Sequence, residues 1–400
     1  MQDVYSIFRI IFGIYLIIHF TYLLPWGAEL FSNEGMLPKG SLSPLYHLFP
    51  NILLLNDSPL VVYIILSTGV LSSICLLLGK MDRYAAILSW YILTCLFDRN
   101  PLIANPSLPY VGWLLLAHAC LPLYNKVNYT WRIPTGVFFA AWLAMAMGYS
   151  YSGYTKLISP SWLDGSAFKH VLYNPLAHSN LITEILLHIP EMGIKCLTWG
   201  ALILELSFAP LSLFTRIRPW IWLMLFSMHI NLLFIIRFPD LSFGMIILHL
   251  FTFNPEWIKP RRIKQSLQVF YDGSCGLCHG FIKFSLSENT YKNSLVFMPL
   301  QGKTFQAFIK FENIAFLPDS IVVYDPDSKI LFYKMKAIIR VLEHLGGLWR
   351  CIAYLLKFIP LTISNIVYDI VAKKRHKFFK KPNAICPLLP PEWKQFILTD

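Results

Sequence analysis

The sequence predicts two parts of different class, a bundle of about eight membrane-spanning α-helices followed by a small α/β domain. Charged residues make up 14% of the 400 residues, and the apolar set AVILMFWYC makes up 56%. Soluble domains are usually about 25% charged, so this composition excludes a single soluble domain and a disordered chain. The charge is also uneven, because residues 1–258 hold 13 Lys and Arg against 12 Asp and Glu, whereas residues 259–400 hold 21 against 10. We therefore expect a membrane domain over 1–258, a basic linker over 259–266 and a soluble domain over 267–400.

Apolar runs separated by short polar breaks are the candidate spans. They cover residues 5–24, 59–79, 84–97, 109–124, 135–155, 196–215, 219–238 and 241–257. A spanning helix needs about 20 residues, and about 17 are tolerated. The third and fourth runs fall short of this length, so a single re-entrant pair is the alternative for them. The first run is too long for a signal-peptide core and lacks a small-residue cleavage site, which predicts a retained helix.

The distribution of Lys and Arg predicts how the spans are oriented. Basic residues without acidic partners gather in alternate loops, because cytoplasmic loops carry the excess of Lys and Arg. These residues are Lys80, Arg83, Lys126, Arg132, Arg216, Arg218, Lys259, Arg261, Arg262 and Lys264. Eight spans with both termini inside satisfy this bias. We expect an integral, multi-pass protein of a bacterial-type inner membrane, with its C-terminal domain in the cytoplasm.

Polar side chains inside the apolar runs are candidate sites, because such residues are costly in a bilayer. They are Arg9, His19, His118, Glu205, His229, Asn231 and His249. A paired network that helps the helices pack is one interpretation of each. A polar cavity lined by several of them is the other.

Lys156, at the end of the fifth run, is a further candidate. A lysine at such a place normally extends to the membrane interface, but desolvation there could instead make it a usable base. The run Ser152-Gly153-Tyr154-Thr155-Lys156-Leu157, followed by Trp162-Leu163-Asp164-Gly165, resembles the horizontally transferred transmembrane domain family, which is related to the vitamin K-dependent γ-glutamyl carboxylases. The resemblance covers about residues 5–258 and places Lys156 where the carboxylases have their catalytic base. Because such a bundle would here be joined to a redox domain, we hypothesise that it binds a quinone-like lipid near Lys156.

The soluble part has a regular order of predicted elements. Strands are expected at 267–271, 295–298, 321–324 and 330–333, and a helix at 335–345 ends at Gly346-Gly347. After the first strand, Asp272-Gly273-Ser274 forms a turn, and Cys275-Gly276-Leu277-Cys278 opens a helix that runs to about Ser287. This β-α-β-(α)-β-β-α order around a C-x-x-C motif is the thioredoxin-like arrangement.

The C-x-x-C motif predicts thiol-disulfide exchange. Cys275 at a helix N-terminus gains thiolate character from the helix dipole and free N–H groups. We expect Cys275 to be the exposed attacking thiol and Cys278 to resolve the mixed disulfide. Half of a zinc site and a structural pair are the alternatives, although no second C-x-x-C exists. Asp272 is either a proton acceptor for the pair or a turn and capping residue, and His279 is expected to be an exposed helix residue.

The same region resembles the DCC family of thiol-disulfide oxidoreductases over about residues 267–397. The family pattern Asp-x-x-Cys-x-x-Cys is Asp272-Gly273-Ser274-Cys275-Gly276-Leu277-Cys278 here. Further matching runs are Met298-Pro299-Leu300-Gln301, Pro318-Asp319-Ser320, Leu345-Gly346-Gly347 and Cys386-Pro387-Leu388. The resemblance implies a thioredoxin-like fold and protein-disulfide reductase activity on a protein disulfide or small-thiol partner, without a cofactor or metal. Pro318 lies near the place of the thioredoxin cis-proline, and Cys386 is either a third redox thiol or a buried family feature.

Two apolar helices are expected over 352–360 and 361–371, followed by Lys373-Lys374-Arg375-His376-Lys377. They are either helical core with a solvated end or a basic face on anionic lipid of the bilayer. No nucleic-acid recognition motif accompanies this charge.

Three functions remain open at this point. The first is a membrane-tethered protein-disulfide reductase. The second is a carboxylase-like or quinone-handling membrane enzyme with Lys156 as base and the C-x-x-C domain as its reductant. The third is a receptor or scaffold without catalysis.

Overall fold

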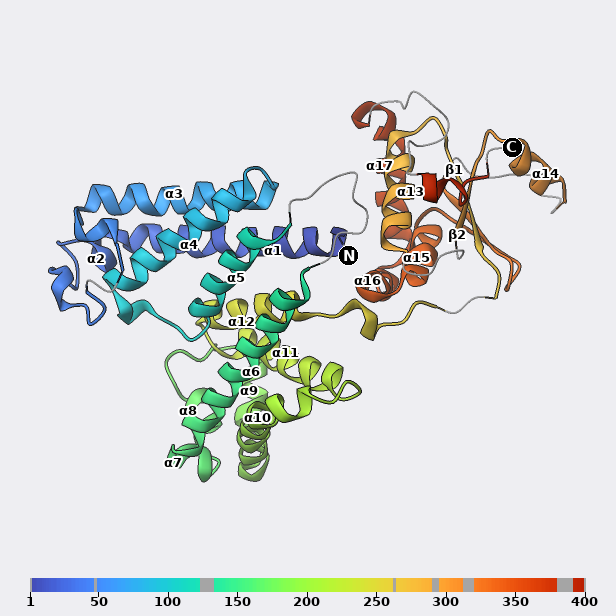
Figure 1. The fold of residues 1–400 in the computed structure, drawn as a ribbon. Coiled ribbons are helices and arrows are strands. Elements are labelled where there is room, and N and C mark those ends of the chain that lie inside the picture. The colour runs from blue at the N-terminus through green and yellow to red at the C-terminus, as the bar shows by residue number, and fades with distance from the viewer. Residues whose placement is uncertain are drawn as a thin grey trace. The chain divides into compact units, whose positions relative to one another are not determined.

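The computed structural model describes residues 2–46, 49–122, 133–261, 264–289, 295–311, 320–379 and 391–398. The chain forms two compact units, which we describe separately (Figure 1). One unit contains Tyr5–Leu123 and Ile133–Phe253, and the other contains Asn254–Asp400 together with Met1–Val4 and Tyr124–Arg132.

Within its described residues, the first unit consists of helices joined by loops, with one isolated β-bridge between Ala177 and Ile236. Its longer helices are α1 (Gln2–Leu23), α3 (Pro59–Leu78), α4 (Asp82–Arg99), α5 (Leu108–Cys120), α6 (Thr135–Leu157), α10 (Glu191–Ser212), α11 (Arg218–Ile235) and α12 (Pro239–Thr252). Four short helices, α2 (Gly27–Phe31), α7 (Pro160–Leu163), α8 (Ala167–Leu172) and α9 (Leu181–Leu187), lie in the connections. Proline occupies the first turn of α3, α5, α11 and α12, where its missing N–H costs no hydrogen bond.

Within the described residues, four helical segments are long and apolar enough to cross a membrane. They are Val4–Phe31, Pro59–Leu78, Glu191–Ser212 and Arg218–Ile235. The unit is therefore compatible with a membrane protein, but the prediction of about eight spans is not confirmed. Helices α5 and α12 have only 13 and 14 residues, and α4 carries two charged residues at each end.

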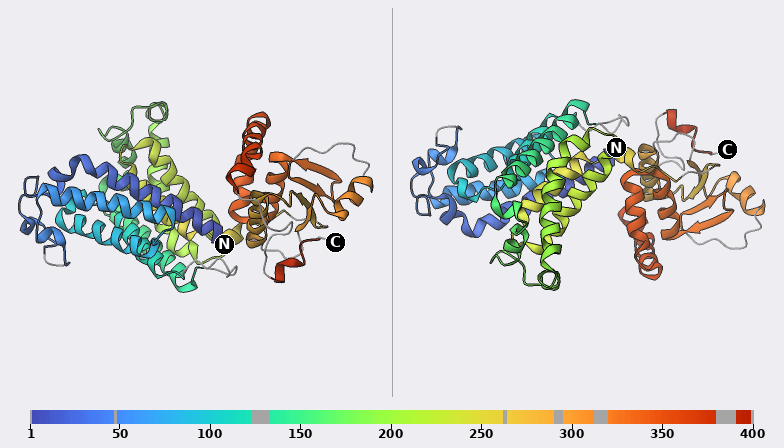
Figure 2. Two further views of the ribbon diagram at one scale, coloured as in Figure 1. Left: turned by 90° about the horizontal axis from the view of Figure 1, so that it is seen from above. Right: turned by 90° about the horizontal axis from the view of Figure 1, so that it is seen from below.

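Small residues let α1 and α3 approach each other closely. A Cβ atom added to Gly13 of α1 would lie 2.8 Å from the Cα atom of Leu77 on α3. Small residues at such positions are typical of helix pairs that pack in a membrane. Figure 2 shows α1, α3 and α4 side by side, and α6, α10, α11 and α12 form the other part of the unit through mutual contacts.

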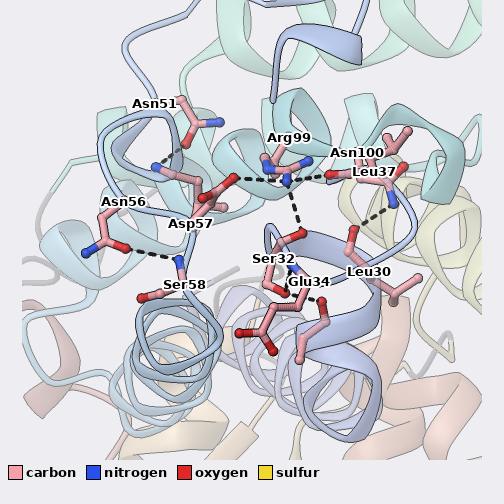
Figure 3. Close-up of polar contacts among 12 residues, drawn as sticks. Leu30, Ser32, Glu34, Leu37, Asn51, Asn56, Asp57, Ser58, Arg99 and Asn100 are labelled. Carbon is pink, nitrogen blue, oxygen red and sulfur yellow. Dashed lines mark hydrogen bonds and ion pairs between the residues drawn. The ribbon is translucent and has the colours of Figure 1, made fainter. Parts of the chain in front are cut away.

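A fully buried guanidinium, that of Arg99, organises the connection between α1 and α3. It donates hydrogen bonds to the carbonyl oxygens of Ser32 and Leu37, at 3.1 and 2.6 Å, and lies 3.0 Å from Oδ2 of Asp57 (Figure 3). Arg99 itself is the last residue of α4. The end of α4 is therefore bound to three points of the segment that joins α1 to α3.

The second unit contains a four-stranded mixed sheet. Strands β1 (Leu267–Tyr271), β2 (Leu295–Pro299), β3 (Val322–Asp325) and β4 (Ile330–Tyr333) have the spatial order β2-β1-β3-β4. Strand β1 pairs in parallel with β2 and antiparallel with β3, and β3 and β4 form an antiparallel hairpin. The predicted strand ranges are confirmed to within one residue, because short apolar runs bounded by turn residues are local signals.

Helices cover both faces of this sheet (Figures 1 and 2). Helices α13 (Gly276–Glu288), α15 (Lys334–Leu345), α16 (Gly347–Lys357) and α17 (Leu361–Phe378) contribute to the core on one face. Helix α14 (Lys303–Phe311) covers the other face, where Phe305 and Phe308 pack against Phe270. A short helix, α18 (Pro391–Lys394), precedes a parallel bridge from Ile397 to Phe297 of β2.

Candidate functional site

The C-x-x-C motif lies where β1 passes into α13. Strand β1 ends at Tyr271, and the N–H of Cys275 donates to the carbonyl oxygen of Asp272 at 3.2 Å, which closes the turn. Cys275 is the N-cap residue with extended backbone angles, and α13 begins at Gly276. The cysteine therefore stands at the end of the helix where N–H groups without helical acceptors gather.

The two thiols have opposite acid strengths. A hydrogen bond from Cys278 is the main reason why the pKa of Cys275 is lowered to about 6. Backbone N–H groups of residues 277 and 278 and the charge of Arg375 add to this effect, against the opposing effect of burial. The same hydrogen bond, together with burial, raises the pKa of Cys278 far above its ordinary value. At neutral pH one thiolate is therefore favoured, and it is on Cys275.

The expectation that Cys275 is exposed is wrong. The residue is 1% exposed, whereas Cys278 is half-buried. Cys278 lies beside it on α13, and Arg375 of α17 is near enough to influence both sulfur atoms. Neighbours supplied by a distant helix cannot be inferred from the motif itself.

Asp272 connects three segments around the turn. Its Oδ1 accepts hydrogen bonds from the N–H and the hydroxyl of Ser274, at 2.9 and 2.7 Å, and from Nε2 of Gln301 at 3.0 Å. Burial would raise the pKa of Asp272, but these hydrogen bonds and the charge of Arg375 hold it below its ordinary value. A carboxylate that stays ionised is a weak proton acceptor, so this geometry favours the turn role over the proton-acceptor role.

Arg375 is a functional candidate that the sequence reasoning missed. Its Nη2 lies 3.2 Å from Oδ2 of Asp272, and both side chains are largely buried. The basic run 373–377 indicated only a solvated or lipid-facing helix end. The available signal was spacing, because Ser364, Tyr368 and Arg375 recur at intervals of four and seven residues on the inward face of α17.

His279 is buried, and the expectation of an exposed helix residue is wrong. It is 7% exposed, and its Nε2 donates to the carbonyl oxygen of Gly273 at 3.0 Å. The imidazole thus fastens the turn to the first turn of α13. Pro318 and Cys386 lie outside the described residues. Within the described part of the chain, no group of three or more His, Cys, Asp or Glu could hold a metal ion.

In the helical unit, the structure brings Lys156 and Glu205 together. The ammonium group of Lys156 forms an ion pair with Oε2 of Glu205 and donates to Oγ of Ser152 at 2.7 Å. It also lies 4.9 Å from the ring centroid of Trp162. Lys156 is therefore an ion-paired cation between α6 and α10.

Three of the other polar candidates of this unit, His19, His229 and His249, belong to two hydrogen-bonded clusters. The remaining three are outside both clusters. Tyr149 Oη lies 2.9 Å from Nε2 of His229 and 3.3 Å from Nε2 of His249. Asp240 accepts hydrogen bonds from Tyr15, His19 and Asn105 at 2.5 to 3.0 Å. Sequence reasoning missed Tyr149 and Asp240, because a tyrosine in an aromatic-rich run and an acid at a helix start carry no distinctive pattern.

Each of the remaining three candidates, Arg9, His118 and Asn231, makes its own hydrogen bond outside these clusters. Arg9 donates to the carbonyl oxygen of Leu77 at 2.8 Å. His118 lies 2.5 Å from the hydroxyl of Tyr5, and Asn231 donates to a carbonyl oxygen in its own helix. None of these contacts joins the two clusters.

Comparisons with known proteins concern the second unit. A family model described as DCC1-like thiol-disulfide oxidoreductase matches residues 269–381. Uncharacterized protein YuxK of Bacillus subtilis is 31% identical over 131 residues, which are 32% of this chain and 92% of that protein. DCC family protein At1g52590, chloroplastic, of Arabidopsis thaliana is 25% identical over 137 residues, 32% of this chain and 76% of that protein. No solved structure matches the chain significantly. Through its C-terminal domain, the chain therefore belongs to the DCC1-like thiol-disulfide oxidoreductase family, which supports a general redox role.

Proposed function

We propose that the protein is a membrane-tethered protein-disulfide reductase that uses Cys275 and Cys278. The observation that carries this proposal is the asymmetry of the pair, since one thiol has its pKa lowered to about 6 and its neighbour has its pKa raised. An attacking thiol must be ionised and a resolving thiol must hold its proton until it acts. The family membership supports redox chemistry of the same kind.

The proposed reaction balances as a dithiol–disulfide exchange. Cys275 is 1% exposed, so the proposed step requires the turn before α13 to open first. The Cys275 thiolate then attacks one sulfur of the partner's disulfide, and the other sulfur leaves as a thiolate that takes up a proton. Cys278 then loses its proton and attacks Cys275, which releases the second partner thiol. The domain ends as a Cys275–Cys278 disulfide, two electrons having passed to the partner. Arg375 and Asp272 act as positioning residues for this turn.

The direction of the reaction follows from the compartment. In this proposal the domain is cytoplasmic, which is supported by the excess of Lys and Arg in alternate loops if all eight apolar runs are spans. Cytosolic thiols are kept reduced, so the resting form there is the dithiol and the partner is reduced. The four apolar helices supply the tether.

The experiment that tests the proposal uses the fragment 254–400. The YuxK alignment supports its independence, because the matching region makes up 92% of that relative. The fragment is titrated against a dithiothreitol or glutathione series and assayed for reduction of insulin disulfides. We expect a reversible two-electron couple with turnover, both lost in Cys275→Ser.

Cys351 provides the matched control. It lies on α16, is half-buried, and has its pKa raised by burial. Cys351→Ser should leave the couple and the turnover unchanged. Equal loss in both variants, or stoichiometric zinc in place of a redox couple, would contradict the proposal.

A second function of the helical unit is favoured by one observation. The Lys156–Glu205 pair lies between α6 and α10, and Tyr149, which contacts His229 and His249, is within electrostatic range of Glu205. The ammonium group of Lys156, which is largely buried, can donate a hydrogen bond to a carbonyl oxygen of a quinone-like lipid. We propose that such a lipid binds here and exchanges electrons with the C-x-x-C domain.

The test for this second function is to measure quinone binding to the full chain in detergent. Quenching of the protein's tryptophan fluorescence reports the binding. Lys156→Met should weaken binding, whereas Lys195→Met, which removes an exposed ion pair with Glu191, serves as the control. Unchanged binding in Lys156→Met would overturn this part.

A further inference from the structure

The α16–α17 elbow has an inner face that is bound tightly to its own domain. Tyr368 of α17 accepts a hydrogen bond from the N–H of Ile321 at 3.0 Å, and Lys334 forms an ion pair with Asp369 at 2.8 Å. Arg375 reaches Asp272 from the same helix. These contacts fix the orientation of α17 about its own axis. They therefore determine which of its residues face away from the domain.

The outer face of α17 is apolar in its first half. Ile363 and Ile366 are each 54% exposed and Ile370 is 51% exposed. These positions recur every three to four residues, which places them on one side of the helix. Two large apolar side chains at the end of α16 and in the bend are exposed as well, since Leu355 is 66% and Phe358 is 84% exposed.

The same face becomes basic in its second half. Lys373, Lys374 and Lys377 are exposed, and the spacing of three to four residues continues from Ile370 through Lys373 to Lys377. On α17, one strip thus passes from exposed isoleucines to ammonium groups. We call this strip, formed by Ile363, Ile366, Ile370, Lys373, Lys374 and Lys377, together with the exposed Leu355 and Phe358 at the bend, the elbow surface.

The geometry of the elbow indicates how it meets a bilayer. Gly347–Lys357 and Leu361–Arg375 are together apolar enough for a membrane span, but they meet at 115°. Two helices bent this sharply do not form one straight rod across a membrane. A helix whose exposed apolar side chains are followed along the same face by lysines can place the apolar part in the membrane interface while the lysines reach lipid phosphates.

We propose that the elbow surface binds an anionic lipid bilayer. The isoleucines and Phe358 enter the interfacial layer, and the three lysines contact lipid phosphates. One partner accounts for both halves of the surface, because a bilayer presents acyl chains and negative charge side by side. A protein partner would need an apolar patch that continues into an acidic one at the same spacing. The chain also has four helices that are long and apolar enough to cross a membrane. If they do so, the domain is tethered to a bilayer.

Photocrosslinking of the full chain in lipid nanodiscs tests the proposal. The photoreactive residue p-benzoylphenylalanine replaces Phe358 or Ile366, and in a control it replaces Ile330. Ile330 is also 50% exposed but lies on β4. In nanodiscs of three parts phosphatidylcholine and one part phosphatidylglycerol, we expect lipid adducts at the first two positions and about tenfold fewer at the control, measured by mass spectrometry.

The other possible occupants are outcomes of the same experiment. Crosslinks from Phe358 and Ile366 to peptides of this chain would overturn the proposal, and their masses would identify the helical unit or a second copy as the occupant. Lipid adducts at all three positions in equal yield would overturn it as well. These outcomes are independent of disulfide exchange, because the readout does not involve the cysteines.

A charge series tests the basic half of the surface. Lys373→Gln with Lys374→Gln should lower the adduct yield by about fivefold or more in anionic nanodiscs, and should leave the yield in pure phosphatidylcholine unchanged. Lys329→Gln with Lys336→Gln, two exposed lysines away from the elbow, is the matched control. Equal effects of the two pairs would exclude a role of the lysines in lipid contact.

Discussion

The hydrogen bond between the two thiols of the C-x-x-C motif is the first interaction to perturb, through Cys278→Ala. With a pKa of about 6, Cys275 is about 90% thiolate at pH 7, against about 3% for an ordinary cysteine. The bond from Cys278 is the largest cause of the lowered pKa, so its loss should raise that pKa by at least one unit, or about 1.4 kcal/mol. At pH 6 the thiolate fraction should fall from about one half to about one tenth or less.

Absorbance at 240 nm measures this thiolate without requiring access to the sulfur. The titration uses fragment 254–400 in which Cys351 and Cys386 are replaced by Ser, so that only the active-site thiols titrate. Because Cys275 is 1% exposed, alkylation by iodoacetamide should lag behind the thiolate fraction, which separates access from ionisation. A midpoint above pH 8 with Cys278 present, or an unchanged midpoint in Cys278→Ala, would refute the reasoning.

Three further changes have predictable outcomes. Arg375→Gln should raise the pKa of Cys275 by less than Cys278→Ala does, because it removes a smaller contribution, and the same 240 nm titration measures this. Burial, aided by a nearby arginine, lowers the pKa of His344 to about 4, below its unfolded value of about 6.5. The contribution of neutral His344 to the free energy of unfolding is therefore fully present above about pH 6.5 and is lost as the pH falls towards 4. Urea unfolding of fragment 254–400 should show a loss of about 2 kcal/mol from this group between pH 7.5 and pH 5, and His344→Gln should lack that component. Glu205→Leu leaves Lys156 without its carboxylate and should lower the unfolding temperature of the full chain in detergent, whereas adding Lys156→Met should restore most of it. Additive losses in the double variant would show that the ion pair is not what stabilises this site.

The C-terminal sheet could be predicted because its signals are local. Val269, Phe297 and Val323 lie in short, almost continuous apolar runs that are buried and end at turn residues, and each predicted strand agrees with the structure to within one residue. The helical unit was less predictable. Runs of apolar residues indicated helices, but the charges at the ends of α4 serve contacts inside the unit, such as that of Arg99 with Asp57. An apolar run in the sequence therefore does not by itself count as a span.

Only those site residues that lie in one continuous segment could be predicted from the sequence. The C-x-x-C turn follows from nine consecutive residues, 271–279. Arg375 is 103 residues away from Asp272 and enters only through the packing of α17. The pair of Lys156 with Glu205 has the same character, because sequence reasoning singled out both residues but had no means to join groups 49 residues apart.

The buried Arg99 cluster has a consequence for how the protein is made. The segment between α1 and α3 obtains its closing contacts from a guanidinium that follows Asp57 by 42 residues. During synthesis this segment emerges from the ribosome before its partner, so it cannot complete its fold until α4 has been produced. The chain must also deliver the end of α4 to the same side as that segment. If α4 were inserted with the wrong orientation, the acceptors on Ser32, Leu37 and Asp57 would lack the Arg99 donor. The cluster therefore stabilises only the correctly assembled arrangement.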